Sequence, residues 1–417
     1  MSRRRLDTES LRRDGPPVVS GWRPVRLLRV DVDSLVPPAP LDVASGDRVW
    51  IEAVRHGRII GLVEATAGAE GLPTAALVEL ASAQEGHDDT AIDAVPDSAL
   101  ARATVVIPTI CTNPVNLVRT VDSLLAMDYP AFDVVVVDNR TDPAAPALPA
   151  LPGGEQVRTV REPRPGISAA RNAGAAVASG EFIAFTDDDA VADPRWLRAL
   201  GARFAVDEQV EAIGGLVLPL ELDTEPQLWF EEFYGGFSRS FQPEVVSVEL
   251  IGGTDPLFPY APGRFGAGCN MAFRRAALER IGGFDTALGV GTPAKGGEDL
   301  AMFVAFLLAG GTLAFEPAAV VRHSHRRTER AFLRQVLHYG TGLTAMYTSM
   351  VVHDPRHLAA MLRKVPAGVR LLTRPRAERS PSRAPSYPRV ALAYQVAGMA
   401  YGPIAYARSV LRARWSS

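Results

Sequence analysis

The stretch from Thr104 to Thr186 alternates short apolar runs with helical periodicities, and this alternation limits the folds open to the chain more than any other feature. Strands are expected at 104–107, 133–137, 157–160 and 181–186, with helices at 114–127 and 166–178 between them. The four consecutive valines at 134–137 are typical of a strand covered on both faces. The pattern predicts an α/β fold with a mostly parallel sheet and helices on both faces.

Length and composition place this fold within a larger, folded chain. The 417 residues suggest two or three domains, and 47% hydrophobic with 22% charged residues argues against global disorder. Forty-four basic and forty-seven acidic residues leave a net charge of −3, so we expect no nucleic-acid partner. Two cysteines exclude a disulfide scaffold and favour a reducing, cytoplasmic location.

The flanking regions divide the chain into four parts. Residues 1–21 are expected to be a disordered arm, and 22–100 a small β-rich module with strands at 25–32, 48–53 and 58–64, a helix at 72–82 and a linker from 84. The α/β domain is expected at 101–326 and a helical C-terminal region at 327–417.

Carboxylates follow two of the predicted strands. Asp187, Asp188 and Asp189 come directly after the apolar run at 182–185, and Asp138 follows the earlier apolar strand at 134–137. Because ligands bind at the carboxyl ends of parallel strands, these side chains are candidates for a site that holds Mg²⁺ or Mn²⁺. The alternative is a solvated acidic turn and an Asx-turn residue.

Further candidates lie later in the chain. Glu298 and Asp299 follow a Gly pair and precede an apolar helix, where they are either an N-terminal cap or a positioned general base. His323 and His325 follow an expected strand at 319–321 and are either surface residues or metal and phosphate ligands. An aromatic segment at 228–241, which contains Trp229, is either core or a wall on which a sugar stacks.

Eight short motifs occur in an order that resembles family 2 glycosyltransferases of the GT-A fold. They span about 104–325, and several motifs in the right order are far more specific than one. They are VVIPT (105–109), VVVVDN (134–139), GISAARNAG (166–174), FTDDD (185–189), GAGCNMAFRR (266–275), IGGFD (281–285), GGEDLAM (296–302) and VRHSH (321–325).

This resemblance implies a role for each matching residue. Asp187 and Asp189 would hold the metal together with His323, although the choice between His323 and His325 stays open. Asp299, with Glu298 beside it, would be the general base. The residues assigned to the nucleotide-sugar are Thr109, Asp138, Arg171, Asn172 and Asp188, and those assigned to the acceptor are Trp229 and Asn270. Where many members carry a second Asp after Asp138, this chain has Asn139.

The implied reaction is a metal-dependent transfer of sugar from a nucleotide-sugar donor to an acceptor hydroxyl with inversion. A cation at the diphosphate stabilises the departing charge, and a carboxylate on the opposite face takes the proton of the acceptor. The acceptor is expected to be a cell-envelope glycan or a lipid-linked one. The rivals are an inactive glycan-binding or scaffold protein, which intact carboxylates disfavour, and a sugar-1-phosphate nucleotidyltransferase, whose Gly-rich opening is absent after Ile107.

Two C-terminal segments indicate a contact outside the catalytic domain. Residues 356–372 have a basic amphipathic pattern, and 390–407 carry no charge for eighteen residues. Both are expected to be helices that give a peripheral contact with the inner face of the plasma membrane. The alternatives are packing on the catalytic domain and a homodimer contact.

Overall fold

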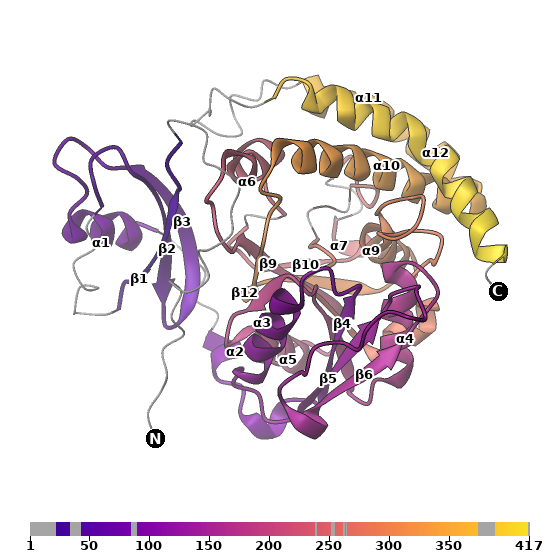
Figure 1. Cartoon of the computed structure of the whole chain (residues 1–417), viewed down its shortest axis with the longest axis horizontal. Coiled ribbons are helices and arrows are strands. Elements are labelled where there is room, and N and C mark those ends of the chain that lie inside the picture. Colours follow the sequence, from indigo (N-terminus) through magenta and orange to yellow (C-terminus); the bar gives the residue numbers. More distant parts are fainter. Residues whose placement is uncertain are drawn as a thin grey trace.

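The computed structural model describes residues 22–33, 43–84, 90–237, 240–251, 255–261, 263, 265–373 and 388–415 (Figure 1). The arm expected at 1–21 lies outside these residues. The described chain forms a large mixed sheet covered by helices, a small N-terminal sheet and a C-terminal group of helices, so the predicted fold class is confirmed.

Nine strands form the large sheet. They are β4 (Ala103–Thr109), β5 (Phe132–Asp138), β6 (Val157–Arg161), β7 (Phe182–Phe185), β8 (Ala190–Ala192), β9 (Val210–Pro219), β10 (Glu244–Val246), β11 (Met271–Arg274) and β12 (Thr312–His323). Their order is β10-β12-β9-β11-β7-β4-β5-β6, and β8 pairs with β12. The strands β4 to β7 run parallel, and β11 is antiparallel to both β7 and β9. Since β9 and β12 are parallel, the ends of β4, β5, β7 and β12 reach the same edge of the sheet.

Helices cover both faces of this sheet because its central strands are apolar on both sides. Val105 and Val134 pack with α3 (Pro114–Leu125) and α5 (Trp196–Val206), whereas Val106 and Val135 pack with α4 (Ile167–Val177), α8 (Arg275–Ile281) and α9 (Glu298–Leu308). Successive side chains of a strand point to opposite faces, which explains the division. The helix α3 begins where Asn113 accepts a hydrogen bond from the Val115 amide and Pro114 takes the first helical position.

The N-terminal module is a sheet of β1 (Arg26–Asp31), β2 (Arg48–Arg55) and β3 (Arg58–Thr66), with α1 (Thr74–Ser82) packed on one face. Its other face lies against the large sheet, where Val54 and Ile59 pack with Leu216 and Leu218 of β9. The module therefore shares part of its core with the domain of the large sheet.

The segment expected to be a linker is partly helical, and here the expectation was wrong. The chain forms α2 (Thr90–Asp93) and the short 3₁₀ helix η1 (Asp97–Ala99), while 85–89 lie outside the described residues. Ile92 and Leu100 are buried in the core that contains Val105. The high content of Asp, Gly and Pro in this segment predicted a linker, although Ile92 and Leu100 are buried apolar residues.

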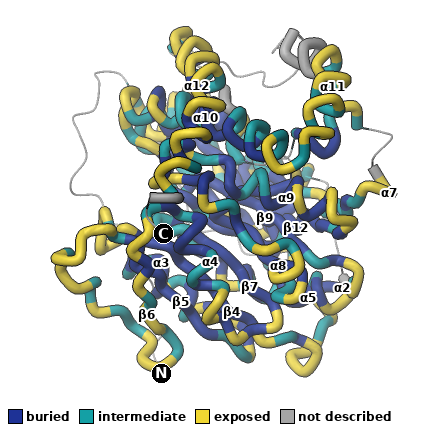
Figure 2. The backbone as a smooth tube through the Cα atoms, turned by 90° about the vertical axis from the view of Figure 1, so that its right-hand side faces the viewer, coloured by how far each residue is buried: buried dark blue, intermediate teal, exposed yellow. Residues whose placement is uncertain are grey.

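Three long helices follow the sheet: α10 (Glu329–His353), α11 (Arg356–Thr373) and α12 (Ala391–Trp415). The helices α10 and α12 cross at small residues, because a Cβ on Gly340 would lie 2.3 Å from the Gln395 carbonyl oxygen. Figure 2 shows α11 and α12 at the same end of the molecule, with α10 beside them. Within the described residues, none of the helices has the length and hydropathy that a membrane span requires.

A buried ion cluster joins the N-terminal module to β12. Arg322 donates to Glu52 of β2 at 2.6 Å and to Asp193, which follows β8, at 3.4 Å. Both carboxylates are buried, and Arg322 is the residue before His323 at the end of β12. The cluster therefore fixes the N-terminal module to the strand end that carries a predicted site residue.

Replacing Arg322 tests how firmly this cluster binds the two parts together. Arg322→Met should lower the free energy of unfolding by about 3 kcal/mol, because the buried Glu52 loses its cation, while Asp193 keeps Arg29 at 3.1 Å. Arg23→Met is the matched control, since the Arg23–Asp47 pair is exposed, and it should cost less than about 1 kcal/mol. Urea denaturation at neutral pH measures both, and equal losses would contradict the assignment.

Candidate functional site

The three aspartates lie at the carboxyl edge of the sheet, directly after β7. Thr109, the last residue of β4, donates its hydroxyl hydrogen bond to Asp188 and accepts one from the Cys111 amide at 2.8 Å. Burial is the main cause that raises the pKa of Asp188 to about 6, with Asp189 and Asp187 adding repulsion. The structure thus brings together two neighbouring strand ends that the sequence places far apart.

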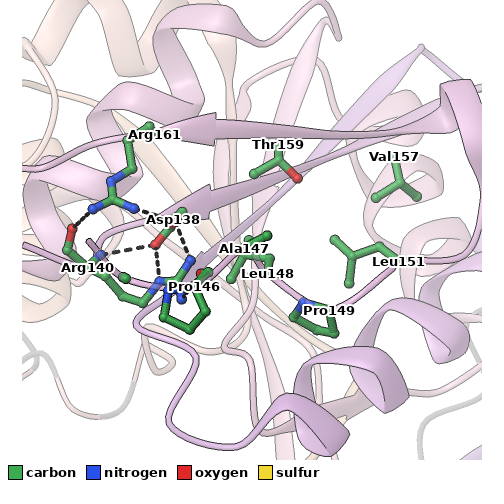
Figure 3. A pocket seen from close by; sticks show the side chains of 11 residues that line it. Asp138, Arg140, Pro146, Ala147, Leu148, Pro149, Leu151, Val157, Thr159 and Arg161 are labelled. Carbon is green, nitrogen blue, oxygen red and sulfur yellow. Dashed lines mark hydrogen bonds and ion pairs between the residues drawn. The ribbon is translucent and has the colours of Figure 1, made fainter. Parts of the chain in front are cut away.

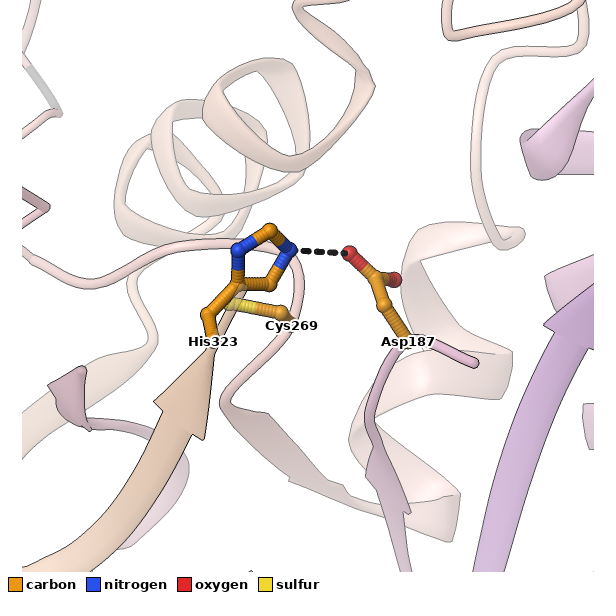
Figure 4. A group of neighbouring side chains, drawn as sticks. All are labelled: Asp187, Cys269 and His323. Carbon is orange, nitrogen blue, oxygen red and sulfur yellow. Dashed lines mark ion pairs between the residues drawn. The ribbon is translucent and has the colours of Figure 1, made fainter. Parts of the chain in front are cut away.

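His323 reaches the same aspartates from the end of β12. Its Nε2 lies 3.1 Å from Asp189 and 4.0 Å from Asp187, as Figure 4 shows for the second pair. Burial alone would raise the pKa of Asp189, but the imidazole of His323 outweighs it and brings that pKa to about 2. Burial disfavours the protonated form of His323 and would lower its pKa. The attraction of Asp189 is stronger, so the pKa of His323 is raised.

His325 lies elsewhere. Its Nε2 pairs with Glu231, its side chain is buried, and its ring packs on Phe230 of the π-turn η3 (Phe230–Tyr234) at 4.5 Å between centroids. Of the two histidines that the sequence left open, only His323 contacts the aspartates among the described residues.

A fully buried guanidinium connects the aspartates to the second acidic pair. Arg171 of α4 donates to Asp187 at 3.2 Å, to Glu298 at 2.9 Å and to the Gly268 carbonyl at 3.0 Å. Only 1% of its side chain is exposed, so the carboxylates of Asp187 and Glu298, rather than water, balance its positive charge. The guanidinium of Arg171 therefore contacts the carboxylates of both acidic groups.

Glu298 and Asp299 begin α9 and differ in their surroundings. Glu298 is buried, and burial followed by repulsion from Asp299 raises its pKa although Arg171 lies beside it. Asp299 is half-buried and accepts from the Gly268 amide at 2.8 Å. A Cβ on Gly268 would lie 2.8 Å from Arg171 and 3.2 Å from Asp299, so a larger residue here would have to displace the Arg171 guanidinium.

Asp138 ends β5 beside a cavity of about 460 Å³ (Figure 3). Its carboxylate accepts from Arg140 Nε and Nη2 and from Arg161 Nη1, each at 2.7 Å. The hydrogen bonds from Arg140 are the main cause that lowers the pKa of Asp138. The cavity is also lined by residues of the segment 145–151 and by Thr159.

Two predicted site residues use their polar groups inside the protein. Asn172 binds the amide and carbonyl of Phe284, both at 2.8 Å. Asn270 is buried, accepts from Trp196 and donates to the carbonyls of Leu216 and Ala319, all at 2.8 Å. Both side-chain amides thus bind groups of the protein itself. The sequence interpretation expected them to contact the nucleotide-sugar and the acceptor.

Trp229, expected at the acceptor, also lies away from the aspartates. It ends α6 (Glu225–Trp229), is buried, and its ring meets Phe332 of α10 edge-on at 5.7 Å. Trp229 thus contributes to the packing between α6 and α10, whereas Phe237 of the same aromatic segment packs on His323 with 5.5 Å between ring centroids.

Some residues of the site had no role in the sequence interpretation. Arg140 and Arg161 hold Asp138, Gly268 separates Arg171 from Asp299, and the Cys269 sulfur lies within 4.8 Å of ligand atoms of Asp187 and His323. Gly268 and Cys269 belong to the GAGCN stretch and could have been found from it. The two arginines had no such signal.

The group of Asp187, Asp189 and His323 fits a divalent metal. Carboxylate oxygens and an imidazole suit Mn²⁺, and the carboxylates repel one another without a cation. The Nδ1 of His323 is buried and has no protein partner among the described residues. Burial raises the pKa of the Cys269 thiol well above its usual range, so the oxygen and nitrogen atoms are the better ligands here.

The model of the glycosyl transferase family 2 domain matches residues 104–282. Similar curated proteins include a glucosyl-dolichyl phosphate glucuronosyltransferase of Haloferax volcanii, 29% identical over 41% of this chain and 51% of that protein. Another is the succinoglycan biosynthesis protein ExoM of Rhizobium meliloti, 33% identical over 49% of this chain and 62% of that protein. The chain spans about half the length of the curated relatives it matches.

Among solved structures, a mannosyltransferase from Pyrobaculum calidifontis in complex with GDP-Man and Mn²⁺ is similar with a TM-score of 0.47. It is 18% identical, and the match covers 75% of this chain and 91% of that chain.

The two histidines offer a matched test of the metal site. His323→Gln should weaken Mn²⁺ binding by at least about tenfold, because a ligand is lost, whereas His325→Gln should change it by less than about twofold. Calorimetric titration with MnCl₂ in the presence of a nucleoside diphosphate measures both. A similar loss in the two variants would contradict the assignment.

Proposed function

We propose that this protein is a metal-dependent inverting glycosyltransferase. The proposal rests first on the match of residues 104–282 to the glycosyl transferase family 2 model. In this proposal the protein moves a sugar from a nucleotide-sugar donor to an acceptor hydroxyl. Asp187, Asp189 and His323 hold a Mg²⁺ or Mn²⁺ ion, and Asp299 is the general base.

The observation that carries the proposal is the single guanidinium of Arg171 between two acidic groups with different surroundings. Asp187 on one side belongs to the candidate metal cluster, and Glu298 on the other precedes the half-buried Asp299. Sugar transfer with inversion needs a charge-stabilising group at the leaving diphosphate and a base on the opposite side of the sugar. In this proposal the group with Asp187 has the first task and Asp299 has the second.

Each group has a defined task in this reaction. A bound divalent ion supplies positive charge that stabilises the departing diphosphate. Asp299, held by the Gly268 amide, takes the proton of the acceptor hydroxyl as its oxygen attacks the anomeric carbon. The bond from the anomeric carbon to the diphosphate oxygen breaks in the same step, so the configuration inverts.

The donor nucleoside is proposed to lie beside Thr109 and Asp138, next to the cavity of about 460 Å³. Arg140 and Arg161 already neutralise Asp138. Their guanidinium groups, rather than the carboxylate alone, would then contact the nucleoside. For the acceptor we propose a glycolipid or a cell-envelope glycan, in keeping with the names of the relatives.

A donor screen tests the proposal directly. The full chain is incubated with UDP- and GDP-linked sugars, with Mg²⁺ or Mn²⁺, and released nucleoside diphosphate is measured. Release from at least one donor, lost in Asp189→Asn, is the expected result. No release from any donor with either metal, in the presence of lipid and glycan acceptors, would argue against the activity.

Nucleotide binding should depend on the metal. Removing divalent ions with EDTA should weaken nucleoside diphosphate binding at least about tenfold, because the phosphate charges would face uncompensated carboxylates. Calorimetry with and without EDTA measures the difference. Unchanged affinity would refute a metal held by Asp187 and Asp189.

Asp299→Asn should spare donor binding and lower turnover by at least about a hundredfold, the usual size of a general-base contribution. The asparagine oxygen can still accept the Gly268 hydrogen bond, so the fold should persist. Glu298→Gln is the matched control beside it, since the amide can keep its bond to Arg171. Normal turnover of a folded Asp299→Asn variant would leave Asp299 with only a structural role.

A further inference from the structure

The helix α12 has one face packed on the protein and one face open. On the packed face, Thr344 of α10 donates to the Met399 carbonyl at 2.8 Å, and Tyr406 donates to Asp285 at 3.2 Å. Ala391 and Ala405 are buried on the same side. These contacts fix the orientation of α12, so its outer face is defined.

The outer face of α12 carries a row of large apolar side chains. Leu392, Val396, Ile404 and Leu411 are between 55% and 57% exposed. Their spacings of four, eight and seven residues place them on one side of the helix. Single exposed apolar residues are ordinary, but a continuous row along a helix marks an interaction surface.

The helix α11 repeats the arrangement. His357 and Lys364 face the protein, where they bind the Tyr260 hydroxyl at 2.8 Å and the Pro256 carbonyl at 3.1 Å. Leu358, Leu362 and Val365 are between 50% and 61% exposed, and none of the side chains described in this helix is buried. Figure 2 shows both helices projecting from the same end of the molecule with exposed outer sides.

Charge separates the C-terminal sequence from the rest of the chain. Residues 356–417 contain twelve basic residues and one acidic residue, Glu378, whereas the other residues contain thirty-two basic and forty-six acidic ones. The C-terminal region therefore carries a net charge of +11 and the remainder −14. Within the described part, Arg363 borders the apolar row of α11, and Arg408 and Arg412 border that of α12.

This charge decides between the partners that an apolar surface could bind. A second copy of the chain would bring two regions of charge +11 together, and their repulsion would oppose the contact. An anionic lipid surface offers the opposite charge and an apolar interior for the leucine, valine and isoleucine side chains. Tyr394 and Tyr401 on α12 are half-exposed, and tyrosine suits the boundary between lipid and water.

We infer that the outer faces of α11 and α12 together form a docking surface for an anionic phospholipid bilayer. The apolar rows enter the boundary of the acyl chains while the arginines remain at the headgroups. The apolar rows of the two helices and the arginines that border them supply the two signals that stable attachment requires. The inference does not depend on the proposed sugar transfer.

Vesicle flotation with the full chain tests it. Vesicles of phosphatidylcholine, with or without about 30% phosphatidylglycerol, are compared at about 50 mM and about 500 mM NaCl. The chain should float with anionic vesicles at low salt, at least about tenfold more than with neutral ones, and salt should reduce the binding. Absence of flotation with anionic vesicles would overturn the inference.

The double variant Leu362→Asp/Ile404→Asp identifies the surface. It should lower the fraction that floats by at least about tenfold, whereas Val206→Asp, at an exposed position at the end of α5, should leave it within about twofold. Circular dichroism confirms that the variants are folded. Unchanged flotation of the double variant would overturn the inference, as would a dimer in sedimentation that this variant converts to a monomer. No donor is present in this assay, so a failed donor screen would leave its result intact.

Discussion

The arrangement of the site depends on the buried guanidinium of Arg171. Five carboxylates, at 187–189 and 298–299, lie around the carboxyl edge of the sheet, and their repulsion would separate them without a cation. A point charge at one position could not reach both groups, whereas a planar guanidinium presents donors on several sides. Arg171 thereby fixes Asp187 relative to Glu298, and the Gly268 backbone continues the network to Asp299. The distance between the two acidic groups is thus set by one side chain.

A second arginine, Arg322, holds two carboxylates together farther from the three aspartates. Arg322 neutralises Glu52 and Asp193 and lies next to His323, so the N-terminal module supports the strand end that carries the histidine. The shared core of Val54 and Leu218 supports the same contact from the apolar side. The small N-terminal sheet is therefore a structural part of the site's framework, although none of its residues contacts the aspartates in the described chain.

The sequence predicts the parts of this structure that depend on local patterns. The alternation of strands and helices at 104–186 is strongly periodic. Because the carboxyl ends of parallel strands lie at the same edge of a sheet, the sequence also predicts Asp187 and Asp138 at that edge. The hydrogen bonds of Asn270 could not be predicted, because its partners at Leu216 and Ala319 come from distant segments. The same holds for Ile92, whose burial depends on a core formed elsewhere in the chain.

The C-terminal helices contact the loop that precedes Glu298 and Asp299 through a close backbone approach between α10 and that loop. A Cβ on Gly342 of α10 would lie 2.7 Å from Gly296, and one on Gly297 would lie 2.4 Å from the Gly342 carbonyl oxygen. Since Gly297 precedes Glu298, α10 touches the loop that presents Asp299. The helix α12 packs on α10 and reaches the same loop through the Ser409 hydroxyl, which accepts from the Ala294 amide at 3.2 Å. The helices α10 and α12 therefore both contact the segment 294–297 that leads into Glu298 and Asp299.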